Sequence, residues 1–209
     1  MCYFARLGVL SLGSLVAALA SADAKALMPD YASVTIREQI QINYYPVSGD
    51  TFDVIMNSIM ANGPAAARKG ITVGATRAHL GYQSEYRVSP TLCTLSNATI
   101  TLNLVVSLPK HTASQSLDPG LRFRWQGFVK HVTDHELRHV AIYRAGVIGV
   151  KHEFERLAWQ PHCELLAQRM KSLWAVARQS IETENQAFER SEAGFRSSAA
   201  VTLSHGSRK

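Results

Sequence analysis

Residues 135–139 read His-Glu-Leu-Arg-His, with two histidines four positions apart and a glutamate directly after the first. On a helix, residues four apart lie on one face about one turn from each other, so His135 and His139 could bind one zinc ion. Zinc lowers the pKa of a bound water from about 15.7 toward about 7. Glu136 could take a proton from that water as it attacks a carbonyl, then deliver it to a leaving amine. The spacing therefore indicates zinc-dependent hydrolysis of peptide bonds.

The same five residues could also belong to an ordinary charged helix that carries two histidines. Three features favour the metal site: the motif lies in a segment with helical periodicity, that segment follows an alternating strand, and the N-terminus predicts export. A sheet edge beside the metal helix is similar to the arrangement of zincin peptidases, in which that edge binds extended substrate. We therefore expect His135 and His139 to be zinc ligands and Glu136 to be the catalytic base.

The motif belongs to a longer stripe of His131, His135, His139 and Tyr143, each four residues from the next. The outer histidines are about 12 Å apart along a straight helix, so all three cannot bind one ion. We expect His131 to be a half-exposed helix residue, the alternative being a role beside the ligands or with substrate. Tyr143 is expected to pack in the core, the alternative being donation to an oxyanion.

A catalytic zinc site usually has three protein ligands and a water, and the local sequence does not supply the third ligand. The extended metzincin pattern would need a histidine six residues after His139, where the chain has Ala145. His152 lies about 20 Å along an unbroken helix and could bind only if the helix broke at Gly146 or Gly149.

An antiparallel return of the chain offers a second route to a third ligand. If the turn centres near residues 159–161, residues 180–190 come back level with the two histidines. The geometric candidates on that segment are Glu182, Glu184 and Glu189.

The periodicity of the rest of the chain predicts the elements that must position these residues. Residues 33–47 read as one or two strands, residues 71–88 as further strand, and residues 98–109 as a strand with one buried face. A short helix is expected between the first two, ended by Asn62-Gly63-Pro64. Two long helices follow, at about 121–157 and 161–189, separated by Pro161. The fold class is α+β: a small, mostly antiparallel sheet with one helix, then two long helices, in a zincin-like arrangement.

The N-terminus predicts export. Arg6 is followed by an apolar run and then by small residues with Ala-x-Ala spacing, which is typical of a secretory signal peptide. The run is short for a membrane span. We therefore expect a signal peptide at 1–24, a metallopeptidase domain at 25–195, an irregular tail at 196–209, and a secreted or periplasmic protein without a membrane span.

Cysteine usage and charge indicate the state of the cysteines and the class of substrate. Cys2 leaves with the signal peptide, so Cys93 and Cys163 are expected to form a disulfide, the alternative being two thiolate ligands to a metal. The net charge is +6 among 209 residues. The basic residues are scattered and not interleaved with aromatic residues, so we expect a peptide or protein substrate and no nucleic acid.

Several segments together resemble a known family. The stretch YPVSGDTFDVIMNSIMANGP at 45–64, Cys93 before a strand, Trp125 ten residues before His135, HELRH, Cys163 and the Asn185 to Glu189 segment carry the likeness. They are similar to bacterial predicted secreted zinc-dependent proteases, a domain-of-unknown-function family with an HExxH motif. The resemblance covers most of the mature chain and implies a zinc-dependent protease.

The chain departs from that family's pattern near its end. Phe188-Glu189 matches the family's Tyr-Asp, but Gly194 stands where the histidine of the following Thr-x-His-Gly is expected. His205 is a displaced candidate for that histidine. The alternative function is therefore a non-catalytic periplasmic or envelope binding protein on a degenerate zincin scaffold.

Overall fold

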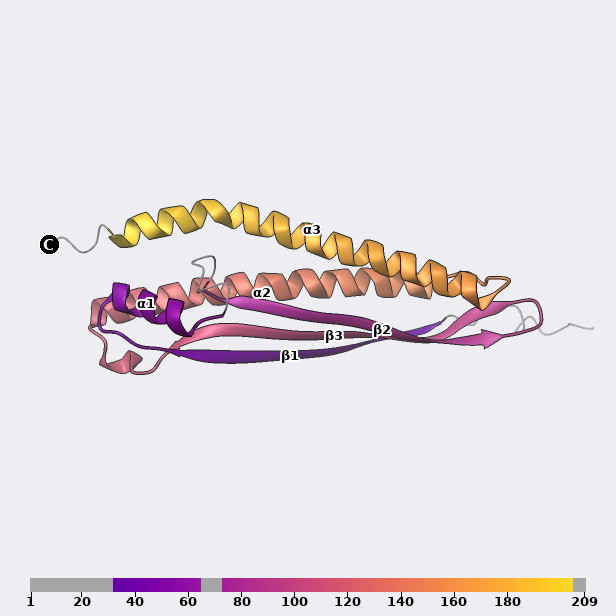
Figure 1. Ribbon diagram of the computed structural model, residues 1–209, viewed down its shortest axis with the longest axis horizontal. Coiled ribbons are helices and arrows are strands. Elements are labelled where there is room, and N and C mark those ends of the chain that lie inside the picture. Colours follow the sequence, from indigo (N-terminus) through magenta and orange to yellow (C-terminus); the bar gives the residue numbers. More distant parts are fainter. Residues whose placement is uncertain (1–31, 65–72, 205–209) are drawn as a thin grey trace, which may run out of the picture. The chain divides into compact units, whose positions relative to one another are not determined.

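The computed structural model describes residues 32–64 and 73–204, with side chains as far as residue 192. The predicted signal peptide at 1–24 and His205 lie outside the described residues. The elements are β1 (Ser33–Val47), α1 (Phe52–Asn62), β2 (Ala75–Val88), β3 (Cys93–His111), a short 3-10 turn (Ser114–Ser116), α2 (Pro119–Glu155) and α3 (Cys163–Ser204), as Figure 1 shows. The predicted α+β class, with a small sheet and a helix followed by two long helices, is confirmed.

The sheet has three strands in the order β1-β3-β2. β2 pairs with β3 antiparallel, and the register places Ala78 opposite Leu104. β1 pairs with β3 parallel, with Ile36 opposite Ile100. The sheet is therefore mixed, and the expected antiparallel arrangement holds for one of its two pairs. The reason is the chain path, because α1 and β2 lie between β1 and β3 and allow β3 to run in the same direction as β1.

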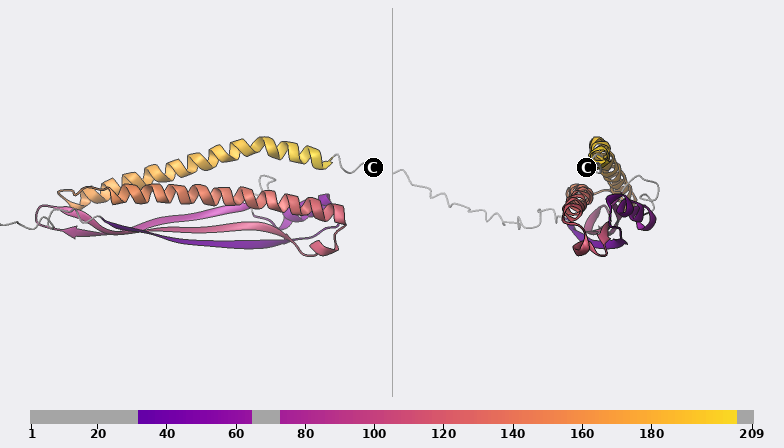
Figure 2. Two further views of the ribbon diagram at one scale, coloured as in Figure 1. Left: turned by 180° about the vertical axis from the view of Figure 1, so that it is seen from behind. Right: turned by 90° about the vertical axis from the view of Figure 1, so that its left-hand side faces the viewer.

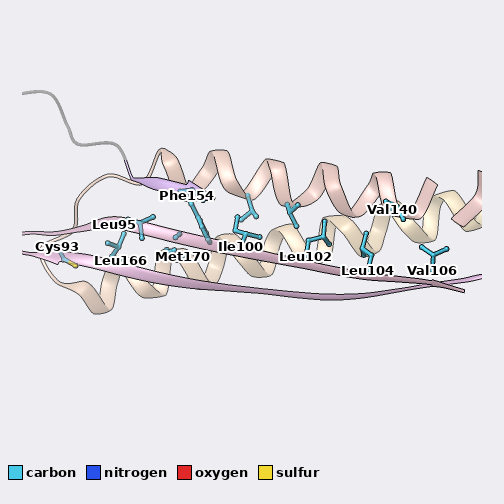
Figure 3. Close-up of a cluster of buried hydrophobic side chains, with 14 of the residues drawn as sticks. Cys93, Leu95, Ile100, Leu102, Leu104, Val106, Val140, Phe154, Leu166 and Met170 are labelled. Atoms are coloured by element: carbon cyan, nitrogen blue, oxygen red, sulfur yellow. The ribbon is translucent and has the colours of Figure 1, made fainter. Parts of the chain in front are cut away.

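β3 forms the centre of the core because its apolar residues alternate along the strand. Ile100, Leu102, Leu104, Val106 and Leu108 are all buried, as the alternation predicts. Figure 3 shows several of these side chains pointing toward the two long helices, where they meet Val140 and Phe154 of α2 and Leu166 and Met170 of α3. Figures 1 and 2 show both helices over the same face of the sheet. α2 contacts all three strands, and α3 packs on α2 and β3.

α2 begins where the sequence predicts. The carboxylate of Asp118 accepts hydrogen bonds from the backbone N–H groups of Gly120 and Leu121, and Pro119 occupies the first turn. The helix then continues through Gly146 and Gly149 without a break. A glycine costs a helix about 1 kcal/mol. At Gly146 close packing offsets this cost, because a Cβ there would lie 2.2 Å from Cγ1 of Ile181 on α3.

The turn between the two helices is fixed to the sheet. Cys93 and Gln160 exchange two backbone hydrogen bonds, and the predicted disulfide joins Cys93 to Cys163 at the start of α3. α3 extends to Ser204, so the irregular tail expected from residue 196 is wrong for 196–204. That stretch has neither proline nor glycine, and extending an existing helix avoids the cost of nucleation.

None of the helices in the described part of the chain combines the length and apolar composition that crossing a membrane requires.

Candidate metal centre

Three side chains from the two long helices converge on one point. Nε2 of His139 lies 2.9 Å from Oε1 of Glu189 and 3.2 Å from Nε2 of His135. Nε2 of His135 lies 3.2 Å from the same Glu189 oxygen. Two histidine nitrogens and one carboxylate oxygen therefore form a compact triangle. Among the residues that the structure describes, this is the one group of three or more His, Cys, Asp or Glu side chains close enough to share a metal ion.

The triangle fits the requirements of a zinc ion. Zinc binds histidine nitrogen and carboxylate oxygen at about 2.0–2.2 Å, and tetrahedral ligands at that radius lie about 3.3–3.6 Å apart. The observed separations of 2.9 to 3.2 Å are slightly shorter, so the three side chains would move apart by a few tenths of an ångström to bind the ion. Three protein ligands leave one tetrahedral position for water or substrate, which is typical of catalytic rather than structural zinc sites.

The three side chains of the centre differ in exposure. The side chains of His135 and His139 are nearly buried, whereas the Glu189 side chain is 40% exposed. Glu189 is therefore the member of the centre that solvent reaches most readily.

The antiparallel return of α3 brings Glu189 to the histidines. Close contacts pair Gly146 with Ile181, His139 with Asn185, and His135 with Glu189. Residue numbers therefore decrease along α2 as they increase along α3, and the two helices are antiparallel. The close approach at Gly146 permits this register. One of the three glutamates expected on the returning segment thus joins the histidines.

The other candidate third ligands lie elsewhere. Glu182 accepts a hydrogen bond from Gln186 on the exposed side of α3, and Glu184 is exposed one and a half turns before Glu189. His152 pairs with Glu155 in the last turn of α2, because that helix does not break.

His131 and Tyr143 flank the centre without joining it. Nε2 of His131 lies 3.8 Å from Oε2 of Glu192, and the same oxygen lies 3.8 Å from Nδ1 of His135. Tyr143 packs against the main core cluster, as expected, and burial raises the pKa of its hydroxyl.

Two further residues of α3 position the histidine rings. Oδ1 of Asn185 lies 2.6 Å from Nδ1 of His139. The Phe188 ring lies 4.8 Å from the His135 ring and 5.0 Å from the His139 ring between centroids. Sequence reasoning assigned neither residue a role. A signal was present, since Asn185 and Glu189 repeat on α3 the four-residue spacing of His135 and His139 on α2.

Glu136 lies against the first residues of β2. It is 2% exposed, and its Oε2 accepts a hydrogen bond of 2.7 Å from the hydroxyl of Thr76. Gly74 leaves room for the carboxylate, because a Cβ there would lie 2.5 Å from Oε1 of Glu136. Burial raises the pKa of Glu136, and the Thr76 hydrogen bond and the two nearby histidines oppose that rise.

Tyr45, near the end of β1, lies close enough to Glu136 to be affected by its charge. Its hydroxyl donates a 2.6 Å hydrogen bond to the backbone carbonyl of Val73, next to Gly74. Burial, and then the charge of Glu136, raise the pKa of Tyr45, so its hydroxyl stays protonated. The hydrogen bond from Thr76 therefore holds the Glu136 carboxylate beside the start of β2. No local sequence pattern connects these strands to the motif.

Comparison with known proteins finds a family model that matches the chain. The sequence model of a family described as bacterial protein of unknown function (DUF922) matches residues 42–196, which include every residue of the candidate centre. No curated protein and no solved structure matches the chain.

Proposed function

The chain belongs to this bacterial family of unknown function, and we propose that it is a zinc-dependent metallopeptidase whose ion is held by His135, His139 and Glu189. The observation that carries the proposal is the convergence of two Nε2 atoms and one carboxylate oxygen within 3.2 Å of one another. The nearby carboxylate of Glu136 distinguishes this donor set from a simple metal-storage or structural site.

The residues around the centre have separate roles in this mechanism. His135, His139 and Glu189 would hold the ion, and a zinc ion in that place would supply a water of lowered pKa and polarise a substrate carbonyl. Glu136 takes the proton from the attacking water and passes it to the leaving amine. Burial raises the pKa of Glu136, which brings a carboxylate closer to the value that efficient general base catalysis near neutral pH requires.

The position of β2 supports a peptide as the substrate class. β2 is an edge strand, and its first residues contact Glu136. An extended peptide pairing with that edge would run beside the metal centre, as the proposed zincin-like arrangement requires. The Cys93–Cys163 disulfide supports action outside the cytoplasm, because such bonds persist in oxidising compartments.

The burial of Glu136 favours a second candidate function, a binding protein that has lost catalysis. At 2% exposure, the carboxylate is covered by protein and meets substrate only if the residues around it move. A binding role does not need an ionisable base at this position, so replacing Glu136 distinguishes the two functions.

The test is the zinc content of the purified mature protein, measured by elemental analysis for the wild type, Glu136→Gln and His139→Ala. We expect one zinc per chain in the wild type and Glu136→Gln, and none in His139→Ala. A peptide-library digest should show cleavage by the wild type and its loss in Glu136→Gln. Glu153→Gln, the same change at an exposed site on α2, is the matched control and should keep both properties.

The outcomes separate the alternatives. No zinc in the wild type after reconstitution would overturn the proposal. One zinc with no cleavage, or with equal cleavage by Glu136→Gln, would instead support the binding protein or a different base.

A further inference from the structure

The Asn185 side chain connects the backbone of α3 to a histidine of the metal centre. Its Nδ2 donates a 2.9 Å hydrogen bond to the carbonyl oxygen of Ile181, one turn earlier on the same helix. Its Oδ1 lies 2.6 Å from Nδ1 of His139. Asn185 is only 8% exposed, so both contacts are shielded from water.

These contacts fix the orientation of the amide. A carbonyl oxygen only accepts hydrogen bonds, so the group that faces Ile181 must be the NH₂. A flipped amide would place two acceptor oxygens against each other in a buried position, at a cost in stability and with no water to relieve it. The group that faces His139 is therefore the amide oxygen, which also only accepts.

From this geometry we propose that Asn185 sets the tautomer of His139, keeping a proton on Nδ1 and leaving Nε2 as the metal-binding nitrogen. The effect on metal binding rests on the proposed metal centre, whereas the tautomer of His139 does not depend on it. Asn185 is a positioning residue, because it contacts Nδ1 of His139 and not the three atoms that would bind the ion.

The consequence is an arrangement that favours a cation. With the proton of His139 held on Nδ1, the lone pair of Nε2 points toward Oε1 of Glu189 at 2.9 Å, so two acceptor atoms face each other. They repel one another unless a positive charge, or a proton carried by Nε2 of His135 at 3.2 Å, lies between them. Asn185 thus prepares the centre for a metal ion before the ion arrives.

α3 presents three polar side chains to the histidines from successive turns, and Asn185 makes the shortest contact. Glu192, one turn after Glu189, faces Nδ1 of His135, but at 3.8 Å the contact is too long for a hydrogen bond. The effect on the tautomer should therefore be larger for His139 than for His135.

The experiment combines the metal-free and zinc-loaded protein. Nitrogen-15 NMR of metal-free wild type at mildly alkaline pH should show Nδ1 of His139 as a protonated, pyrrole-type nitrogen, with the signal assigned by its absence in His139→Gln. Leucine is similar in size to asparagine but has no hydrogen-bonding group, so Asn185→Leu should lose that preference. Asn185→Asp retains the acceptor oxygen that faces His139 and should restore the preference, at the cost of the hydrogen bond to Ile181. Gln186→Leu, an amide removed from the exposed side of the same helix, should leave it unchanged.

Zinc affinity, measured by competition with a chromophoric chelator, is the second measurement. Asn185→Leu should bind zinc roughly 10–100-fold more weakly, while Asn185→Asp and Gln186→Leu stay within a few-fold of wild type. Circular dichroism of the metal-free variants identifies any loss that comes from unfolding, and the Asn185→Asp variant then decides the test.

Each result has a distinct meaning. An unprotonated Nδ1 of His139 in the wild type, or wild-type zinc affinity in folded Asn185→Leu, would overturn the inference. Failure of the wild type to bind zinc would overturn the proposed function, yet the NMR comparison would still decide the tautomer.

Discussion

Oε1 of Glu189 lies 2.9 Å from Nε2 of His139, although 50 residues separate them in the chain. The contact exists because α3 returns along α2 and places its far half beside the HELRH turn. Among the candidate third ligands that the structure describes, Glu189 is the one that contacts both histidines. Its carboxylate should therefore decide whether the site holds a metal ion firmly.

The first prediction is that Glu189→Ala weakens zinc binding more than the roughly 10–100-fold that loss of an outer-shell partner costs. The physical reason is that the variant removes one of three ligand atoms and leaves two histidines. The measurement is a chelator competition titration, with Glu184→Ala as the matched control. Glu184 is an exposed glutamate five residues earlier on α3, and its removal should leave the affinity unchanged. Equal losses in the two variants would indicate a general charge effect rather than ligation.

The second prediction concerns removal of the metal. A ligand that binds only the folded state stabilises it by about 2.7 kcal/mol when present at 100 times its Kd. For a chain of this size, that free energy corresponds to a rise in Tm of roughly 5–10 °C. Differential scanning calorimetry should therefore show a lower Tm after a chelator is added, and recovery when zinc is restored.

The control for this shift is His139→Ala, which lacks a ligand. Its Tm should not respond to chelator or to added zinc. A response as large as that of the wild type would locate the stabilising ion at another site.

The third prediction tests the position of Glu136. In Gly74→Ala, the new methyl group would lie 2.5 Å from Oε1 of Glu136, so the carboxylate must move. Since general base catalysis contributes about 10²–10⁴-fold, kcat should decrease by a factor within that range, while zinc content stays at one per chain. The measurement is hydrolysis of a peptide that the wild type cleaves, together with elemental analysis.

Gly81→Ala, within the β2 strand that follows Gly74, provides the matched control. A Cβ at Gly81 meets no atom within 4 Å, so this variant should keep full activity. An undiminished kcat in Gly74→Ala would show that the close approach of Gly74 to Glu136 does not position the base.

Local periodicity was sufficient to predict the helices and strands, and to bring together two of the three side chains of the candidate metal centre. The four-residue spacing of His135 and His139 places them on one face of a helix, and the alternation in β3 identifies its buried side. The choice between Glu182 and Glu189 could not come from periodicity, because residues seven apart lie on the same helical face. The axial register of α3 against α2 decides which glutamate faces the histidines, and the packing of Ile181 on Gly146 sets that register.

The surroundings of Glu136 depend on tertiary contacts in the same way. Thr76 reaches Glu136 from a strand 60 residues earlier in the chain. Strand order and direction determine which residues of β2 meet α2, and the parallel pairing of β1 with β3 was not predicted. Pairing between distant strands leaves no short-range signal in a single sequence.

The fourth prediction concerns the Cys93–Cys163 disulfide, which closes a loop of 70 residues between the start of β3 and the start of α3. A cross-link over a loop of this length restricts the unfolded chain, so Cys93→Ser with Cys163→Ser should lower the free energy of unfolding by about 2–5 kcal/mol. Urea unfolding monitored by circular dichroism measures the change. Reducing agent should destabilise the wild type by a similar amount and have no effect on the double variant.

The double variant should still bind zinc where it is folded. The two backbone hydrogen bonds between Cys93 and Gln160 remain to hold the turn, and the packing of Ile181 on Gly146 still sets the register of α3 against α2. Loss of zinc from the folded double variant would therefore contradict this prediction. It would mean that the covalent link, rather than helix packing, holds Glu189 level with the histidines.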